Sequence, residues 1–284
     1  MSKSPNVTAE QQNPADACLA GLCEVCQERV GLDRIRKGAQ ARLTVGRCFY
    51  DVRDYAGAYR QFAAAEAVDP QDPATLYWEQ ESARQLARTA FARLERLAPD
   101  SYLVHLLNAQ TLERQKQPES AIWEYKLAIA RQGGVANPHV LLAHLYWYWE
   151  RYDEALPELE EALRLDPADP AANYLMGDSL VQKHQAENAL PYLHQALELR
   201  PGFLNAEASL GRALSQLGRN EEAVSELMKV ATADADGSIH FQLYRLYQKL
   251  GEEDKAQEAL AAFKSIRAHR LPDSAMDSGI SAPQ

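Results

Sequence analysis

The feature that most constrains this chain is a repeat of 34 residues in its middle. Residues 136–169 and 170–203 read ANPHVLLAHLYWYWERYDEALPELEEALRLDPAD and PAANYLMGDSLVQKHQAENALPYLHQALELRPGF. The pairs that fall in register are Ala143 with Gly177, Ala155 with Ala189, Leu159 with Leu193 and Pro167 with Pro201. Self-similarity at a fixed period of about 20 to 50 residues marks a protein built from stacked copies of one unit.

The side chains within each copy predict two helices joined by a turn. Large apolar residues recur at helical spacing along the first half, and small residues recur where two helices would cross. A bulky side chain at Gly177 or Ala189 would hold the two helices apart. Pro201 near the end stops the second helix, because proline lacks an N–H and its ring clashes with the preceding turn. One such pair cannot bury its apolar face alone, so several copies must stack.

This pattern resembles the tetratricopeptide repeat, a helix-turn-helix unit of the same length. The resemblance covers Ala39 to Arg270 and implies an all-α fold, an α-solenoid of about six or seven helical hairpins. By the same resemblance, the hairpins form a right-handed superhelix with a concave groove. The implied divisions of the array are 39–72, 73–101 (shortened), 102–135, 136–169, 170–203, 204–236 and 237–270. Outside it, we expect a capping-helix region over 16–38 and disorder over 1–15 and 271–284.

The second unit, residues 73–101, is five residues shorter than its neighbours, and the shortfall lies at the expected turn. No Gly or Pro lies between Ala74 and Ala98. A seven-residue rhythm continues through the junction, on Leu76, Ala83, Ala90 and Leu97. The unbroken rhythm predicts one long helix in place of a hairpin. A very tight turn between residues 83 and 87 is the alternative.

The charge of the chain limits its partners. Its 284 residues include 30 Lys and Arg against 40 Asp and Glu, a net charge of -10. This argues against general nucleic-acid binding, which needs a basic face to displace counterions. We expect no membrane span, because no run of about 18 apolar residues exists. The first residues lack the apolar core of a signal peptide. We therefore expect a cytoplasmic protein, or a periplasmic or secreted one if the sequence begins after a cleaved signal.

Cysteines and histidines are the candidate metal ligands. All four cysteines lie near the N-terminus, at Cys18, Cys23, Cys26 and Cys48. Their spacing matches no common zinc module, so we expect a thiol cluster, with disulfides if the protein is exported. The histidines at position 4 of their repeats are His105, His139 and His240. They are a repeat or more apart, so packing explains them better than metal ligation.

Catalytic motifs do not stand out in this sequence. Paired carboxylates such as Glu160 and Glu161 are expected on solvated helix faces, and no phosphate loop or nucleophile elbow is present. The sequence therefore predicts a protein that is not an enzyme and needs no cofactor or metal.

The residues of the expected groove come from the first helix of each hairpin. Arg212 and Arg245 share position 9 in successive repeats, which suits an acidic group. Trp147 and Tyr148 either meet a partner or pack against the neighbouring repeat, and Trp149 is expected to pack at the turn. The complete set predicted for the partner-binding groove is His144, Trp147, Tyr148, Tyr174, Asp178, Arg212, Phe241 and Arg245.

Two functions remain from these observations. One is a non-enzymatic scaffold or adaptor that binds a peptide or partner protein in the groove. The other is a structural protein whose repeats stack end to end into an oligomer or filament. Molar mass in solution at two concentrations separates a monomeric adaptor from a self-associating protein.

Overall fold

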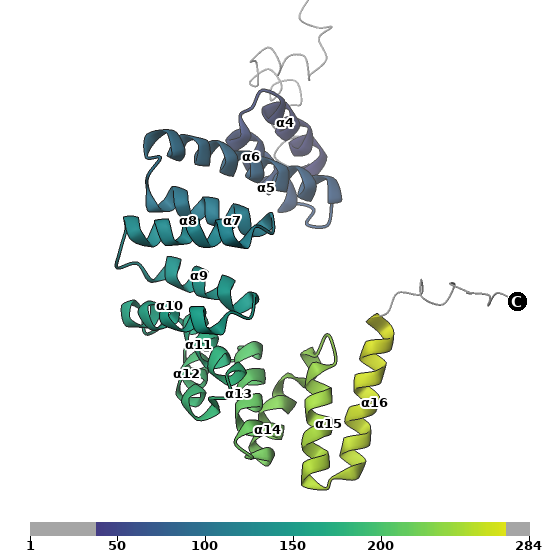
Figure 1. Ribbon diagram of the computed structural model, residues 1–284. Coiled ribbons are helices and arrows are strands. Elements are labelled where there is room, and N and C mark those ends of the chain that lie inside the picture. The colour runs from purple at the N-terminus through teal and green to yellow at the C-terminus, as the bar shows by residue number, and fades with distance from the viewer. Residues whose placement is uncertain (1–37, 271–284) are drawn as a thin grey trace, which may run out of the picture. The chain divides into compact units, whose positions relative to one another are not determined.

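The computed structural model describes residues 38–270, which contain thirteen α-helices, one short 3-10 helix and no strand (Figure 1). This confirms the all-α repeat fold. The chain divides into two compact units, residues 1–99 and 100–284. The predicted capping helix, the two predicted disordered ends and Cys18, Cys23 and Cys26 lie outside the described residues.

The described part of the N-terminal unit, residues 38–99, contains a hairpin and one long helix. Helix α4 (Ala39–Asp51) and α5 (Tyr55–Glu66) form the hairpin, and α6 runs from Pro73 to Leu97. The prediction of a continuous helix through the shortened second unit is therefore confirmed. Asp72 caps its N-terminus by accepting hydrogen bonds from the backbone N–H groups of Ala74 and Thr75, both at 3.2 Å.

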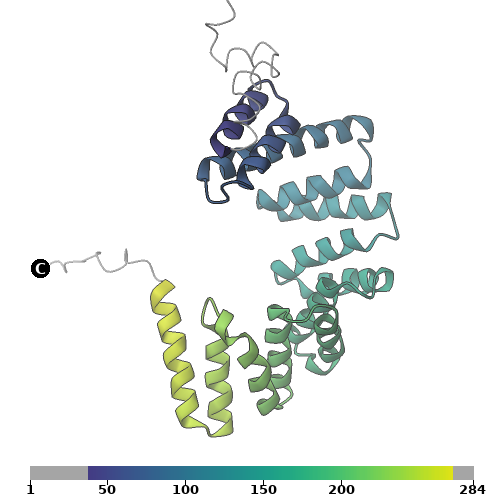
Figure 2. The same cartoon turned by 180° about the vertical axis from the view of Figure 1, so that it is seen from behind.

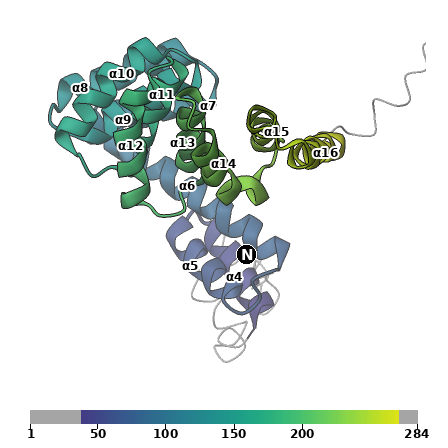
Figure 3. The ribbon, with the colours of Figure 1, turned by 90° about the horizontal axis from the view of Figure 1, so that it is seen from below.

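The C-terminal unit is a row of five hairpins. These are α7 (Tyr102–Arg114) with α8 (Pro118–Arg131), α9 (Ala136–Tyr148) with α10 (Tyr152–Leu165), α11 (Pro170–Gln182) with α12 (Ala186–Leu199), α13 (Leu204–Gln216) with α14 (Asn220–Val230), and α15 (Ser238–Leu250) with α16 (Glu253–Arg270). Each second helix packs on the first helix of the next hairpin, so the hairpins stack in chain order (Figure 2). Figure 3 looks nearly along α15 and α16 and shows them as an adjacent pair. None of the described helices is long and apolar enough to cross a membrane.

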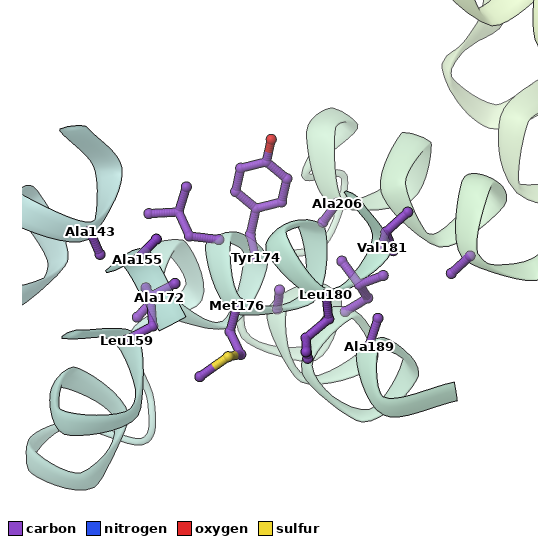
Figure 4. Close-up of a cluster of buried hydrophobic side chains, with 14 of the residues drawn as sticks. Ala143, Ala155, Leu159, Ala172, Tyr174, Met176, Leu180, Val181, Ala189 and Ala206 are labelled. Carbon is purple, nitrogen blue, oxygen red and sulfur yellow. The ribbon is translucent and has the colours of Figure 1, made fainter. Parts of the chain in front are cut away.

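Small residues at the crossing of the two helices set their separation. Ala189 (Figure 4) and Gly177 are buried, as predicted, where α11 crosses α12. A Cβ atom placed on Gly177 would lie 2.6 Å from Cγ of Leu193. One continuous apolar core runs through this unit, from Leu106 to Ala259.

The turn within each hairpin contains a residue in the left-handed region at the fifteenth position of the repeat. Gly218 (φ 76°) and Gly251 (φ 75°) adopt it without a Cβ penalty. The remaining repeats place non-glycine residues there, namely Arg53, Lys116, Glu150 and His184. This conformation ends the first helix of each hairpin.

Candidate functional site

The predicted groove residues lie on four successive first helices, α9, α11, α13 and α15, but they differ in exposure. His144, Tyr148, Phe241 and Arg245 are exposed, and Trp147 and Arg212 are half-buried. Tyr174 and Asp178 are buried. The two buried residues present little surface to a partner, and their part in the groove stays a prediction.

Asp178 is the centre of a buried polar network that joins three successive hairpins. Its side chain is fully buried. Trp147 on α9 donates from Nε1 to Asp178 Oδ2 at 2.7 Å, and Ser209 on α13 donates from Oγ to Oδ1 at 2.6 Å. Arg212 on α13 forms an ion pair with the same carboxylate. A buried charge is tolerated only when it is paired and hydrogen-bonded, and these contacts join Asp178 to the neighbouring hairpins.

Tyr174 is buried for a different reason, because its ring packs against two other aromatic rings. Its ring centroid is 6.1 Å from that of Trp147 and 5.0 Å from that of Phe203. This burial raises the pKa of the Tyr174 hydroxyl well above its usual value. Tyr174 and Trp147 therefore serve mainly to hold α9 against α11.

A cavity of about 480 Å³ lies along α11, α13 and α15. We call it the cationic pocket, and its polar lining residues include His184, Arg212, Gln216, Gln242, Arg245 and Lys249. None of the described residues that line it is acidic. It brings together Arg212 and Arg245, as the sequence predicted, while Phe241 packs instead against Phe263, with ring centroids 5.2 Å apart.

The two arginines of this pocket are not equivalent. The Arg212 side chain is 33% exposed, and its Nη2 atom contacts Asp178 and donates to Ser209 Oγ at 2.8 Å. Arg245 is exposed and, within residues 38–270, makes no hydrogen bond or ion pair. Lys249 is likewise exposed and without a partner in the same range. Two cations of the pocket are therefore uncompensated, and Lys249 was missed by the sequence analysis.

The histidines at position 4 are held by carboxylates. Nδ1 of His105 lies 2.7 Å from Glu124 Oε2, and Nδ1 of His139 lies 2.7 Å from Glu158 Oε2. In the last repeat, Nδ1 of His240 lies 2.7 Å from Asp234 Oδ2. Each His–carboxylate pair links two neighbouring segments of the chain, so we assign these histidines a structural role.

Cys48 is the only predicted thiol among the described residues. It lies on α4 and is 4% exposed. Across residues 38–270, no group of three or more His, Cys, Asp or Glu side chains has an arrangement that could hold a metal ion.

Comparison with known proteins agrees with the fold and its repeats. Two tetratricopeptide-repeat family models match, one over residues 140–183 and the other over residues 180–242. The chain is therefore a tetratricopeptide-repeat protein. Such repeats form a protein-interaction fold that is typically non-catalytic. A search of curated proteins found no match.

Solved structures of the same fold span most of the described chain. YrrB, described as a TPR protein with an unusual peptide-binding site, is 25% identical, with a TM-score of 0.55. The alignment covers 64% of this chain and 94% of YrrB. MamA from Desulfovibrio magneticus RS-1, residues 41 to the end, is 20% identical, with a TM-score of 0.56. Here the alignment covers 60% of this chain and 97% of MamA.

Proposed function

We propose that this protein is a non-enzymatic scaffold or adaptor that binds a peptide segment of a partner protein. The segment lies along the first helices of the C-terminal unit, and its acidic side chains occupy the cationic pocket. Repeat arrays use extended surfaces of this kind for binding. The peptide-binding description of YrrB, a protein of the same fold, also supports the proposal.

The observation that carries the proposal is the local charge of the pocket. The whole chain has a net charge of -10, yet no carboxylate is among the described residues that line this cavity. Arg212 is compensated by Asp178, whereas Arg245 and Lys249 are not compensated. Unpaired cations at the wall of a concave site attract anionic groups and bind carboxylates through charge-assisted hydrogen bonds.

The amides of the pocket suit a peptide better than a simple anion. Gln242 is half-buried and makes no side-chain hydrogen bond among residues 38–270. Gln216 donates through Nε2 to the backbone carbonyl of Val181 at 3.0 Å, which leaves its Oε1 atom as an acceptor. These groups can donate to and accept from a peptide backbone while Arg245 and Lys249 hold the acidic side chains.

The test uses a fluorescein-labelled peptide with capped ends, in which a short run of glutamates is flanked by glycine and serine. We expect Arg245→Gln with Lys249→Gln to weaken its binding about tenfold or more, because two charge-assisted contacts are lost. The matched control is Lys126→Gln with Lys264→Gln, which removes the same charge from exposed positions on α8 and α16. Binding to the parent should also weaken as salt rises. Equal affinities for the two double variants would contradict the proposal.

Sedimentation of the protein alone distinguishes the adaptor from end-to-end self-assembly, which is the other function that the sequence predicts. A mass that is independent of concentration supports the adaptor. A mass that grows with concentration, and grows equally in the Arg245→Gln, Lys249→Gln variant, supports assembly through other surfaces.

A further inference from the structure

A second cavity, of about 390 Å³, lies between the ends of α7 and α9 in the same unit. We call it the aromatic pocket, and its lining residues include Glu113, Arg114, Lys116, Leu145, Tyr148 and Trp149. Its volume falls in the range of roughly 300 to 1,000 Å³ that ligand pockets have.

The aromatic pocket is the counterpart of the cationic pocket, two repeats earlier. Arg114 and Lys116 have the places in their repeat that Gln182 and His184 have later in the chain. Likewise, His144 corresponds to Arg212, and Tyr148 corresponds to Gln216. The repeat backbone therefore forms the same hollow twice, and the side chains give the two hollows different chemistry.

The walls of this pocket are exposed aromatic rings. Tyr148 is 68% exposed and Trp149 is 48% exposed, although Trp149 was expected to pack at the turn. Their ring centroids are 5.9 Å apart and their planes meet at 84°, which makes a right-angled corner. A third ring can stack on one of these rings while it meets the other edge to face. Exposed Tyr and Trp side chains around a hollow are typical of binding hot spots.

Two other lining residues of this pocket lie in ordered surroundings. Leu145 is buried. The His144 ring stacks on Trp147 with centroids 5.8 Å apart, and Trp147 is in turn bonded to the buried Asp178. The part of the wall formed by His144 therefore loses little conformational entropy when a ligand binds.

The positive charges at the edge of the aromatic pocket favour a ligand that carries an anionic group next to its aromatic ring. The side chain of Lys116 is exposed and makes no hydrogen bond or ion pair among the described residues. Arg114 donates from Nη2 only to Thr111 Oγ1, at 3.1 Å. Glu113 is the one carboxylate in the lining, so fixed cations outnumber acids there.

We infer that the aromatic pocket binds an aromatic side chain, flanked by an acidic residue, on the same peptide whose acidic run occupies the cationic pocket. This inference rests on the proposed function. The two pockets are two repeats apart, on the order of 20 Å if successive layers pack at roughly 10 Å. About six extended residues span that distance. The recognised segment therefore has two anchors of different chemistry on one strand of peptide.

The test compares two capped, fluorescein-labelled peptides that share a glutamate run and a spacer of about six residues. One ends in a Phe-Glu pair and the other in Ala-Glu. Both peptides are made in both orders, so that either direction of the peptide along the unit is tested. In one of the orders, we expect the Phe peptide to bind the parent about tenfold to a hundredfold more tightly, from the burial of one aromatic ring.

The tighter binding of the Phe peptide relative to the Ala peptide (the Phe advantage) should disappear in the Tyr148→Ala, Trp149→Ala variant. The Ala peptide should bind this variant as it binds the parent. Trp123→Ala is the matched control, because Trp123 is a 59% exposed tryptophan on α8 outside the pocket. A Phe advantage that survives Tyr148→Ala, Trp149→Ala places the ring elsewhere and overturns the inference. Equal binding of the Phe and Ala peptides by the parent, in both orders, also overturns it and leaves the cationic pocket standing. Failure of both peptides to bind the parent contradicts the proposed function itself.

Discussion

Removal of the Arg212 guanidinium should destabilise the C-terminal unit, although this side chain lies on the wall of a proposed binding site. The Arg212→Ala change leaves the fully buried carboxylate of Asp178 without its cation. Loss of one partner from a buried ion pair costs about 3–5 kcal/mol. Two circumstances reduce this cost. The Arg212 side chain is 33% exposed, and Ser209 and Trp147 still donate to Asp178. We therefore expect a loss of about 2–3 kcal/mol in the free energy of unfolding.

Urea denaturation followed by circular dichroism measures this loss as a lower midpoint at unchanged slope. Arg245→Ala is the matched control, because Arg245 is exposed and has no partner among the described residues, and it should change stability by less than about 0.5 kcal/mol. Adding Asp178→Asn to Arg212→Ala should recover part of the loss, because the buried group is then neutral. If Arg212→Ala and Arg245→Ala have the same midpoint, the buried ion pair does not stabilise the unit as argued.

Three further predictions concern the repeat itself. Gly177→Ala should cost about 1 kcal/mol in a urea melt, because its Cβ would lie 2.6 Å from Cγ of Leu193; an unchanged midpoint would mean that α11 and α12 are less tightly packed. Gly218→Ala should cost about 1–2 kcal/mol through its φ of 76° alone, since nothing lies within 4 Å of the added Cβ atom, and a stabilised variant would contradict this. In the N-terminal unit, hydrogen bonding, chiefly from Arg84, lowers the pKa of Glu81 from 4.5 to about 2. The ionised Glu81 carboxylate therefore stabilises the fold above pH 4.5, and this stabilisation is lost as pH falls toward 2. Glu81→Gln should therefore melt below the parent at neutral pH, with a difference that shrinks over that window; a pH-independent difference would show that the ionised carboxylate is not responsible.

The repeat architecture could be predicted from the sequence because it depends on local rules. The 34-residue period predicts helical hairpins, and the structure has first helices starting at Tyr102, Ala136, Pro170 and Leu204. The long helix α6 followed from the absence of a turn signal between Ala74 and Ala98. Small residues such as Gly177 mark the helix crossing because any larger side chain would collide there.

The site was predicted less completely, because the repeat position of a residue does not fix its exposure. Position 9 is occupied by Asp178, Arg212 and Arg245 in successive repeats. Asp178 is buried, Arg212 is paired with it, and the Arg245 side chain has no partner among residues 38–270. The difference arises from contacts between hairpins, where Trp147 and Ser209 reach the same carboxylate. Position 13 did carry a usable signal. Reading it along residues 102–270 gives Arg114, Tyr148, Gln182, Gln216 and Lys249, which line the two pockets.

The central claim is that the C-terminal unit recognises a peptide through an acidic group and an aromatic ring. Its most direct test is selection of a random displayed-peptide library on the immobilised full chain, followed by sequencing of the bound peptides. The account predicts enrichment of sequences that carry an acidic cluster with an aromatic residue several positions away. The acidic preference should vanish when the same selection is run on the Arg245→Gln, Lys249→Gln variant. Enrichment of basic or purely apolar peptides, or the same acidic sequences on both proteins, would contradict the claim.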